Sequence, residues 1–282
     1  MNLLFRVLSS VALLPFVIYL LWQGGLGFTC LILVAFAVSL FEYTTMVMNH
    51  HRGWQVASVL VSLIALVFIA AALSPIGIIV LIGALCLAIG AYFTLNPDLP
   101  LWQFEKVCVL LFGVFYIGSG LFSVYLLRTG GTLTGQSDLG LQFIFLLLLA
   151  TFSNDTFAYF VGKWLGKHHL SEKVSAKKTW EGFFGGALFT VIVPFAVKAL
   201  FASMGVMVFA LLSTRDIFFI TIPIIFLAPL GDLIESRIKR FYGFKDSGKI
   251  LPGHGGLLDR IDALLITSLW VAAYAFFLRT TW

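Results

Sequence analysis

The sequence predicts an all-α, polytopic integral membrane protein with about nine transmembrane helices and a cytoplasmic N-terminus. Of its 282 residues, 60% are hydrophobic, 29 are phenylalanine and only 11% are charged, which is far more apolar than a soluble domain requires. Apolar stretches of about 20 residues, the length of helix that crosses a bilayer, recur along the whole chain. They lack the alternation of membrane barrel strands and are about twice as long, so we expect helices.

The apolar stretches define the expected spans in order. They cover residues 7–22, 27–48, 54–73, 77–95, 107–127, 140–161, 183–203, 217–235 and 263–280. Arg6 followed by an apolar core gives the first span the form of a signal peptide. No small-residue cleavage site follows it before the second span, so we expect this span to be retained.

The basic residues predict which side of the membrane each loop faces. With the N-terminus inside, 14 of the 18 Lys and Arg residues fall on the cytoplasmic side, in agreement with the positive-inside rule. Both strongly polar loops, 162–182 and 236–262, then lie in the cytoplasm. One interpretation is that these loops only orient the chain and contact anionic headgroups. That interpretation explains the lysines, but it does not explain the acids, glycines and histidine among them.

Carboxylates inside apolar spans indicate a polar site. Such a side chain costs on the order of 3 kcal/mol or more at depth, and it usually faces a bundle interior or a polar cavity. Four carboxylates lie inside a span or at its margin: Glu42, Asp155, Asp232 and Glu235.

The ends of the eighth and ninth spans can bring several of these groups together. Asp232 and Ser236 are four residues apart, and Asp259 and Asp262 are three apart, so each pair shares one face if its segment is helical. Three converging carboxylates would repel one another, and a divalent cation removes that conflict. Oxygen ligands suit Mg²⁺ or Mn²⁺ rather than zinc. The alternative is that Asp259 and Asp262 form ordinary ion pairs with Arg260, Lys239 or Arg240.

The two loops also carry the groups that bind phosphate. Five cations fall within 13 residues: Arg237, Lys239, Arg240, Lys245 and Lys249. The turn "PGHGG" at 252–256 allows backbone N–H groups to approach an anion, and His254 within it is a candidate phosphate contact or proton relay. In the other loop, Ser175, Lys177, Lys178 and Thr179 form a compact hydroxyl and ammonium cluster. A solvated basic loop with a helix cap is the simpler interpretation of this second loop.

The run "SRIKRFYGFKDSGKILPGHGGLLDRID", residues 236–262, resembles throughout the signature of the phosphatidate cytidylyltransferases, also called CDP-diglyceride synthetases. The resemblance extends upstream to the run from Asp155 to Lys167 and to the 175–179 cluster, and with the spans it covers the whole chain. One departure is Ala176, where family members commonly have proline, and alanine leaves the backbone at Ser175 less restricted.

The resemblance implies the reaction CTP + phosphatidate → CDP-diacylglycerol + pyrophosphate, with Mg²⁺ at two metal sites as cofactor, or Mn²⁺ in its place. In the family, acids matching Asp232, Asp259 and Asp262 are the metal ligands, and the hydroxyl matching Ser236 is close to the site; these four are the expected catalytic residues. We assign CTP and lipid headgroup contacts more loosely to Lys239, Arg240, Lys245, His254, Arg260, Ser175, Lys177, Lys178, Thr179 and Asp155.

The resemblance also implies an organisation and a location. We expect N-terminal scaffold helices at residues 1–135 and C-terminal catalytic helices at residues 136–282. The expected partners are CTP, phosphatidate, the lipid bilayer and a second copy of the chain in a homodimer, and nucleic acid is not among them. The expected location is the bacterial cytoplasmic membrane. The alternatives are a CDP-alcohol or prenyl type of lipid transferase, whose motifs are missing, and an ion-coupled transporter, for which no internal repeat is found.

Overall fold

The structure is a computed structural model that describes residues 15–48, 101–133, 137–171, 175–205, 209–250 and 255–278. Residues 15–23 are helical. The elements that follow are α2 (Gly25–Val47), α5 (Leu101–Leu133), α6 (Ser137–Leu165), β1 (His169–Ser171), β2 (Ser175–Thr179), α7 (Trp180–Ser203), α8 (Thr214–Phe241), α9 (Leu258–Ala273) and the π-helical turn η1 (Tyr274–Leu278). The expected helical class is confirmed, and within the described ranges the only strands form one short hairpin.

Five of the described helices are long and apolar enough to cross a membrane. They are Gly25–Val47, Glu105–Gly130, Asp138–Leu165, Trp180–Ser203 and Thr214–Phe241, and they coincide with five of the expected spans. Helical structure is forced on such segments because hydrocarbon offers no partners for backbone N–H and C=O groups. The chain is therefore an integral membrane protein.

The other four expected spans are described in part or not at all. Spans 54–73 and 77–95 lie outside the described residues, as does the first half of span 7–22. At the last expected span the helix α9 begins at Leu258 rather than at residue 263, and its regular α-helical part has 16 residues before η1 continues it. Asp259 and Asp262 therefore both belong to the first turns of α9, and the total of nine spans stays a prediction.

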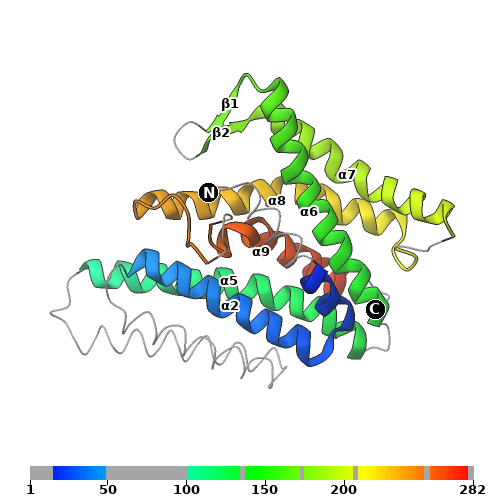
Figure 1. Ribbon diagram of the computed structural model, residues 1–282, viewed down its shortest axis with the longest axis horizontal. Coiled ribbons are helices and arrows are strands. Elements are labelled where there is room, and N and C mark those ends of the chain that lie inside the picture. Colours follow the sequence, from blue (N-terminus) through cyan, green and yellow to red (C-terminus); the bar gives the residue numbers. More distant parts are fainter. Residues whose placement is uncertain are drawn as a thin grey trace.

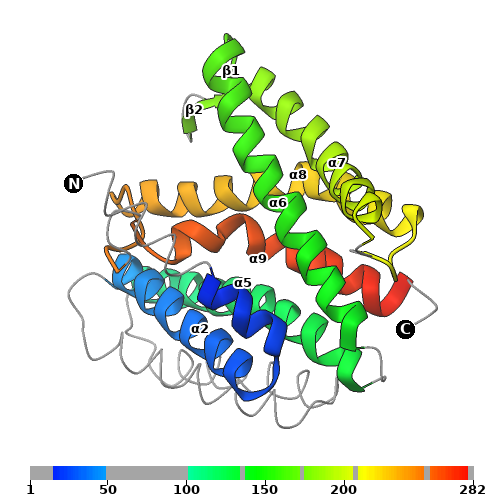
Figure 2. The same cartoon turned by 45° about the vertical axis from the view of Figure 1, so that its right-hand side comes forward.

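Helix α9 lies at the centre of the arrangement (Figures 1 and 2), with α8 on one side and α2 and α5 on the other. Helices α6 and α7 pair closely, and α6 crosses α8 and α9. The backbones of α8 and α9 touch at Gly231, where an added Cβ would lie 2.6 Å from the carbonyl oxygen of Asp262. A small residue is required there, as at many helix contacts within membranes, and the contact sets Asp232 beside Asp262.

The hairpin joins α6 to α7 and carries the 175–179 cluster. Strands β1 and β2 are antiparallel, with His169 opposite Thr179. Thr179 is the N-cap of α7, and its Oγ1 accepts a hydrogen bond of 3.2 Å from the backbone N–H of Gly182. A hydroxyl at this position satisfies an N–H group that the helix itself leaves without a partner. The hairpin is thus fixed to the start of α7 and places β2 beside α8.

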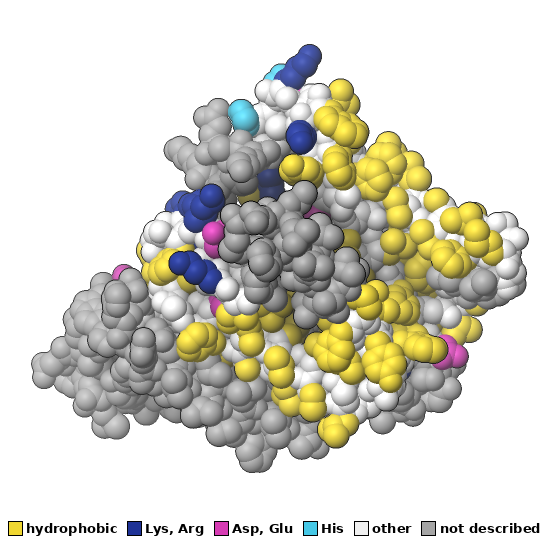
Figure 3. Space-filling view, viewed as in Figure 1, with side chains coloured by type: hydrophobic (Ala, Val, Ile, Leu, Met, Phe, Trp, Pro, Cys, Tyr) yellow, Lys and Arg dark blue, Asp and Glu magenta, His cyan; other side chains and the backbone are white. Residues whose placement is uncertain are grey.

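The surface is divided by polarity. In Figure 3, most of the visible Lys, Arg and His side chains lie toward the end that carries the hairpin and the loop after α8, while hydrophobic side chains cover much of the remaining described surface. An apolar surface of this kind matches contact with lipid chains, and a polar end matches the headgroup region.

Candidate active site

Three carboxylates form a group where α8 meets α9. One oxygen from each of Asp232, Glu235 and Asp262 lies within 4.8 Å of the others. Glu235 is 1% exposed and Asp262 is 9% exposed, whereas Asp232 is half-buried. We call these three residues the acidic cluster. The expected convergence of Asp232 with Asp262 is present, and Glu235 joins them.

The acidic cluster fits a divalent metal ion. Three carboxylates this close repel one another unless positive charge is placed among them. The Oε1 atom of Glu235 is buried and has no hydrogen-bond partner. Because buried polar atoms nearly always have a partner, this oxygen is available to bind a metal ion. Carboxylate oxygens are the donors that Mg²⁺ and Mn²⁺ prefer.

Two lysines contact different members of the acidic cluster. Lys178 in β2 places its Nζ 2.7 Å from Oδ2 of Asp232 and also donates to the carbonyl oxygen of Pro229 at 3.3 Å. Lys239, one turn beyond Glu235 on α8, places its Nζ 2.5 Å from Oε2 of Glu235. The 175–179 cluster and the α8–α9 segment, which lie far apart in the sequence, therefore meet at one site.

Asp259 lies beside the acidic cluster and has other partners. Its Oδ1 is 2.5 Å from Nζ of Lys239, and its Oδ2 accepts hydrogen bonds of 2.9 Å from the backbone N–H groups of Ser247 and Gly256. The Lys239 ammonium and these backbone donors together favour the ionised carboxylate. The ion-pair alternative with Lys239 describes Asp259 in this structure, and its role as a metal ligand stays a prediction.

Two further expected residues belong to the site. Ser236 Oγ donates to Oδ1 of Asp232 at 3.0 Å, which confirms that the two share a helix face. Asp155 on α6 interacts electrostatically with both Asp232 and Lys178. Helix α6 therefore adds a further carboxylate near the acidic cluster.

The remaining expected residues contribute less here. Arg240 is exposed and donates to the carbonyl oxygen of Phe244 at 3.4 Å, and Lys245 and Arg260 are also exposed. Thr179 caps α7. His254 lies outside the described residues, and so do the side chains of Ser175 and Lys177.

Sequence reasoning missed two groups at the site. The sequence marks Glu235 as a carboxylate within a span, but it does not predict that Glu235 lies beside Asp232 and Asp262. Tyr116 on α5 gave no signal, because a tyrosine in an apolar run is common. Its buried hydroxyl lies 3.1 Å from the carbonyl oxygen of Asp262 and 3.4 Å from that of Gly231. Tyr116 thus contacts both helices where the ligands project.

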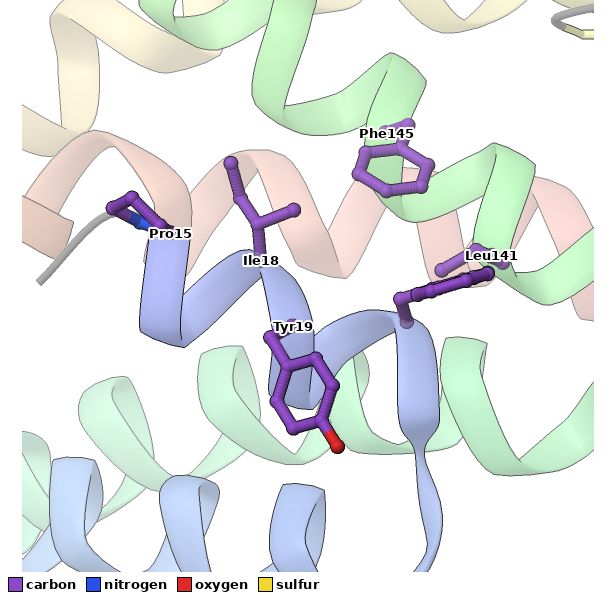
Figure 4. A pocket seen from close by; sticks show the side chains of 6 residues that line it. Pro15, Ile18, Tyr19, Leu141 and Phe145 are labelled. Carbon is purple, nitrogen blue, oxygen red and sulfur yellow. The ribbon is translucent and has the colours of Figure 1, made fainter.

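A separate hollow of about 650 Å³ lies between helix 15–23 and the start of α6 (Figure 4). None of its lining side chains ionises near neutral pH, and all six have apolar bodies. They are Pro15, Ile18, Tyr19, Trp22, Leu141 and Phe145. The acidic cluster, not this hollow, holds the groups that can carry out chemistry.

Comparison with known proteins identifies the family. The pattern of the cytidylyltransferase family matches residues 4–278, which is nearly the whole chain. The chain belongs to the cytidylyltransferase family. A protein of Staphylococcus epidermidis named phosphatidate cytidylyltransferase is 32% identical over 92% of this chain and 94% of its own length. A Brucella abortus protein of the same name is 33% identical over 94% of this chain and 90% of its own length. The resemblance of residues 236–262 to the family signature is confirmed.

Proposed function

We propose that this cytidylyltransferase transfers the cytidylyl group of CTP to phosphatidate, giving CDP-diacylglycerol and pyrophosphate, at the acidic cluster of α8 and α9. The observation that carries this proposal is the grouping of Asp232, Glu235 and Asp262 within 4.8 Å, with one buried Glu235 oxygen lacking a partner. The names of the full-length relatives supply the substrates.

Electrostatic repulsion is the main obstacle to this reaction. A lipid phosphate oxygen is already anionic, so it needs little help from a base, but it must approach the α-phosphorus of a triphosphate. Bound Mg²⁺ would supply Lewis acidity and would screen the charge of the phosphates. Asp232, Glu235 and Asp262 would hold Mg²⁺, and Asp259 is the further ligand that the family signature predicts.

The protein's own cations and hydroxyl group act around that centre. In this structure the Lys178 ammonium contacts Asp232, and it is close enough to bind a phosphate oxygen held beside the same carboxylate. Lys239 places one positive charge between the carboxylates of Glu235 and Asp259 and keeps both side chains in place. Ser236 fixes the orientation of Asp232 through its hydrogen bond. Arg240, Lys245 and Arg260 are the exposed cations that can attract the anionic substrates.

Location and assembly are part of the proposal. The excess of Lys and Arg around the acidic cluster supports an active site facing the cytoplasm, in a protein of the bacterial cytoplasmic membrane. Nine spans, two metal sites and a homodimer are the remaining expectations from the family.

A pyrophosphate-release assay on purified protein tests the proposed function. We expect Mg²⁺-dependent release that requires both CTP and phosphatidate, and loss of at least 100-fold of the rate in Asp262→Asn while the protein stays folded. Asp138→Asn is the matched control. Asp138 lies in the first turn of α6, away from Asp155 and the acidic cluster, so this variant should keep the wild-type rate. Reaction with CDP-diacylglycerol as donor, or no dependence on CTP, would indicate another class of membrane transferase or a transporter.

A further inference from the structure

Helix α9 has no cap within its own sequence. Its N-cap residue is Leu257, which has helical backbone angles and makes no side-chain capping hydrogen bond. The first N–H groups of any helix have no partner inside the helix and need acceptors from elsewhere. The acceptors at the start of α9 matter for the site because the first turns of this helix carry Asp259 and Asp262.

A carboxylate from α2 supplies the missing cap. Glu42 Oε1 accepts a hydrogen bond of 3.1 Å from the N–H of Leu257, and its Oε2 accepts one of 2.9 Å from the N–H of Leu258. Ser247 Oγ donates to the same Oε2 at 3.1 Å and accepts from the N–H of Asp259 at 3.3 Å. Three successive N–H groups at the start of α9 are therefore hydrogen-bonded to Glu42, either directly or through the Ser247 hydroxyl. A buried negative charge at this point also complements the helix dipole.

The backbone at Gly248 and Gly256 lies directly against the Glu42 carboxylate. An added Cβ at Gly248 would lie 2.3 Å from Oε1 of Glu42, and one at Gly256 would lie 2.6 Å from Oε2. Glu42 itself is only 2% exposed. The end of α2 and the start of α9 lie side by side in both ribbon views (Figures 1 and 2). Glycines on both sides of the loop thus allow the backbone to approach one carboxylate closely.

The same contacts continue to the acidic cluster. From Ser247 the hydrogen bonds reach the Asp259 carboxylate, then Lys239, then Glu235. Asp262 lies one turn further along the helix that Glu42 caps. Movement at Glu42 would therefore displace the carboxylates on α9 relative to those on α8.

We propose that Glu42 is a positioning residue for the reaction: by capping α9 it holds Asp259 and Asp262 at the correct place relative to Asp232 and Glu235. This inference rests on the proposed function, because the importance of that placement lies in metal binding and cytidylyl transfer. It also makes α2, which the sequence assigns to the scaffold, part of the catalytic unit.

The test is Glu42→Gln, compared with Tyr274→Phe. Glutamine keeps the size of the side chain, but its amide group cannot accept the hydrogen bonds that one carboxylate oxygen accepts. Tyr274→Phe removes one buried hydrogen bond, of 2.6 Å to Asp216, at the far end of the same helical segment. We expect both variants to unfold at lower temperature in detergent. Only Glu42→Gln should lose kcat, by at least 10-fold, with the KM for CTP within threefold of wild type.

Two further measurements separate the outcomes. If Glu42→Gln unfolds at lower temperature but keeps kcat within twofold of wild type, Glu42 is only structural and the proposal is wrong. If Glu42→Gln does not fold, Ser247→Ala replaces it, and a kcat at least threefold below wild type supports the proposal while a wild-type kcat overturns it. If the wild type shows no cytidylyl transfer, the proposed function fails, and Mn²⁺ binding without substrates still tests Glu42. A dissociation constant raised at least fivefold supports the positioning role, and an unchanged one contradicts it.

Discussion

Replacing Glu235 by glutamine removes one charge from the acidic cluster at nearly constant volume. Two effects on the metal-free protein oppose each other. The attraction between Glu235 and Lys239, whose atoms are 2.5 Å apart, is about 7 kcal/mol at an effective dielectric constant of about 20. At 4.8 Å, the upper limit of their separation, the repulsion of Glu235 by Asp232 and Asp262 is about 3.5 kcal/mol each, or about 7 kcal/mol together. Because attraction and repulsion are of similar size, we expect the free energy of unfolding without metal to change by only about 1 kcal/mol.

The metal-bound protein should respond differently. A ligand that binds only the folded state adds about 2.7 kcal/mol to the free energy of unfolding when its concentration is about 100 times its dissociation constant. A loss of one ligand oxygen that raises the dissociation constant tenfold reduces this gain to about 1.4 kcal/mol. Glu235→Gln should therefore lose about half of the stabilisation that Mg²⁺ gives to the wild type.

Thermal unfolding in detergent, measured across a Mg²⁺ titration, checks this reasoning. We expect wild type and Glu235→Gln to have similar midpoints of thermal unfolding in chelator. Added Mg²⁺ should raise the midpoint less in the variant, and the Mg²⁺ concentration that gives half of the rise should be at least 10-fold higher. An equal rise in the two proteins would show that Glu235 does not contribute to metal binding. A large loss of stability in chelator would show that the balance of charges has been misjudged.

Three further substitutions test other parts of the site. Lys178→Met should lower kcat/KM for CTP by about 100-fold in steady-state kinetics, because it removes the ammonium beside Asp232, whereas Lys198→Met at the other end of α7 should not. Tyr116→Phe should lower the free energy of unfolding by about 1 kcal/mol and raise the half-saturating Mg²⁺ in the activity assay, and an unchanged Mg²⁺ dependence would remove Tyr116 from the site. Thr179→Ala should lower the free energy of unfolding by about 1 kcal/mol through loss of the α7 cap, and Thr179→Ser should restore it in the same melting experiment.

Hydrophobic length and helical spacing predicted much of the fold and the centre of the site. Five expected spans match helices in the described part of the chain. Lipid offers no hydrogen-bond partners for backbone groups, and a helix satisfies these groups within the segment itself. The pairing of Ser236 with Asp232 followed from their spacing of four residues, since both lie on one continuous helix. The family signature predicted that carboxylates of the last two helices meet, and Asp232 and Asp262 do lie together.

Other features could not be obtained from spacing because they depend on how helices pack. Asp259 and Asp262 are three residues apart, yet Asp262 lies with the carboxylates of Asp232 and Glu235, while Asp259 contacts the Lys239 ammonium instead. Glu235 lies close to Asp262 because the contact at Gly231 brings α8 against α9. The partner of Glu42 lies more than 200 residues away, so the sequence could show that this carboxylate needs a partner but not which one.

Direct metal binding tests the central claim most plainly. Titration of purified protein with Mn²⁺, followed by electron paramagnetic resonance without substrates, should show a site in the wild type that competes with Mg²⁺. We predict that Asp232→Asn combined with Asp262→Asn weakens this site at least 100-fold while the protein stays folded. Equal Mn²⁺ affinity in wild type and double variant would contradict the account, because the carboxylates of α8 and α9 would then not be the metal ligands.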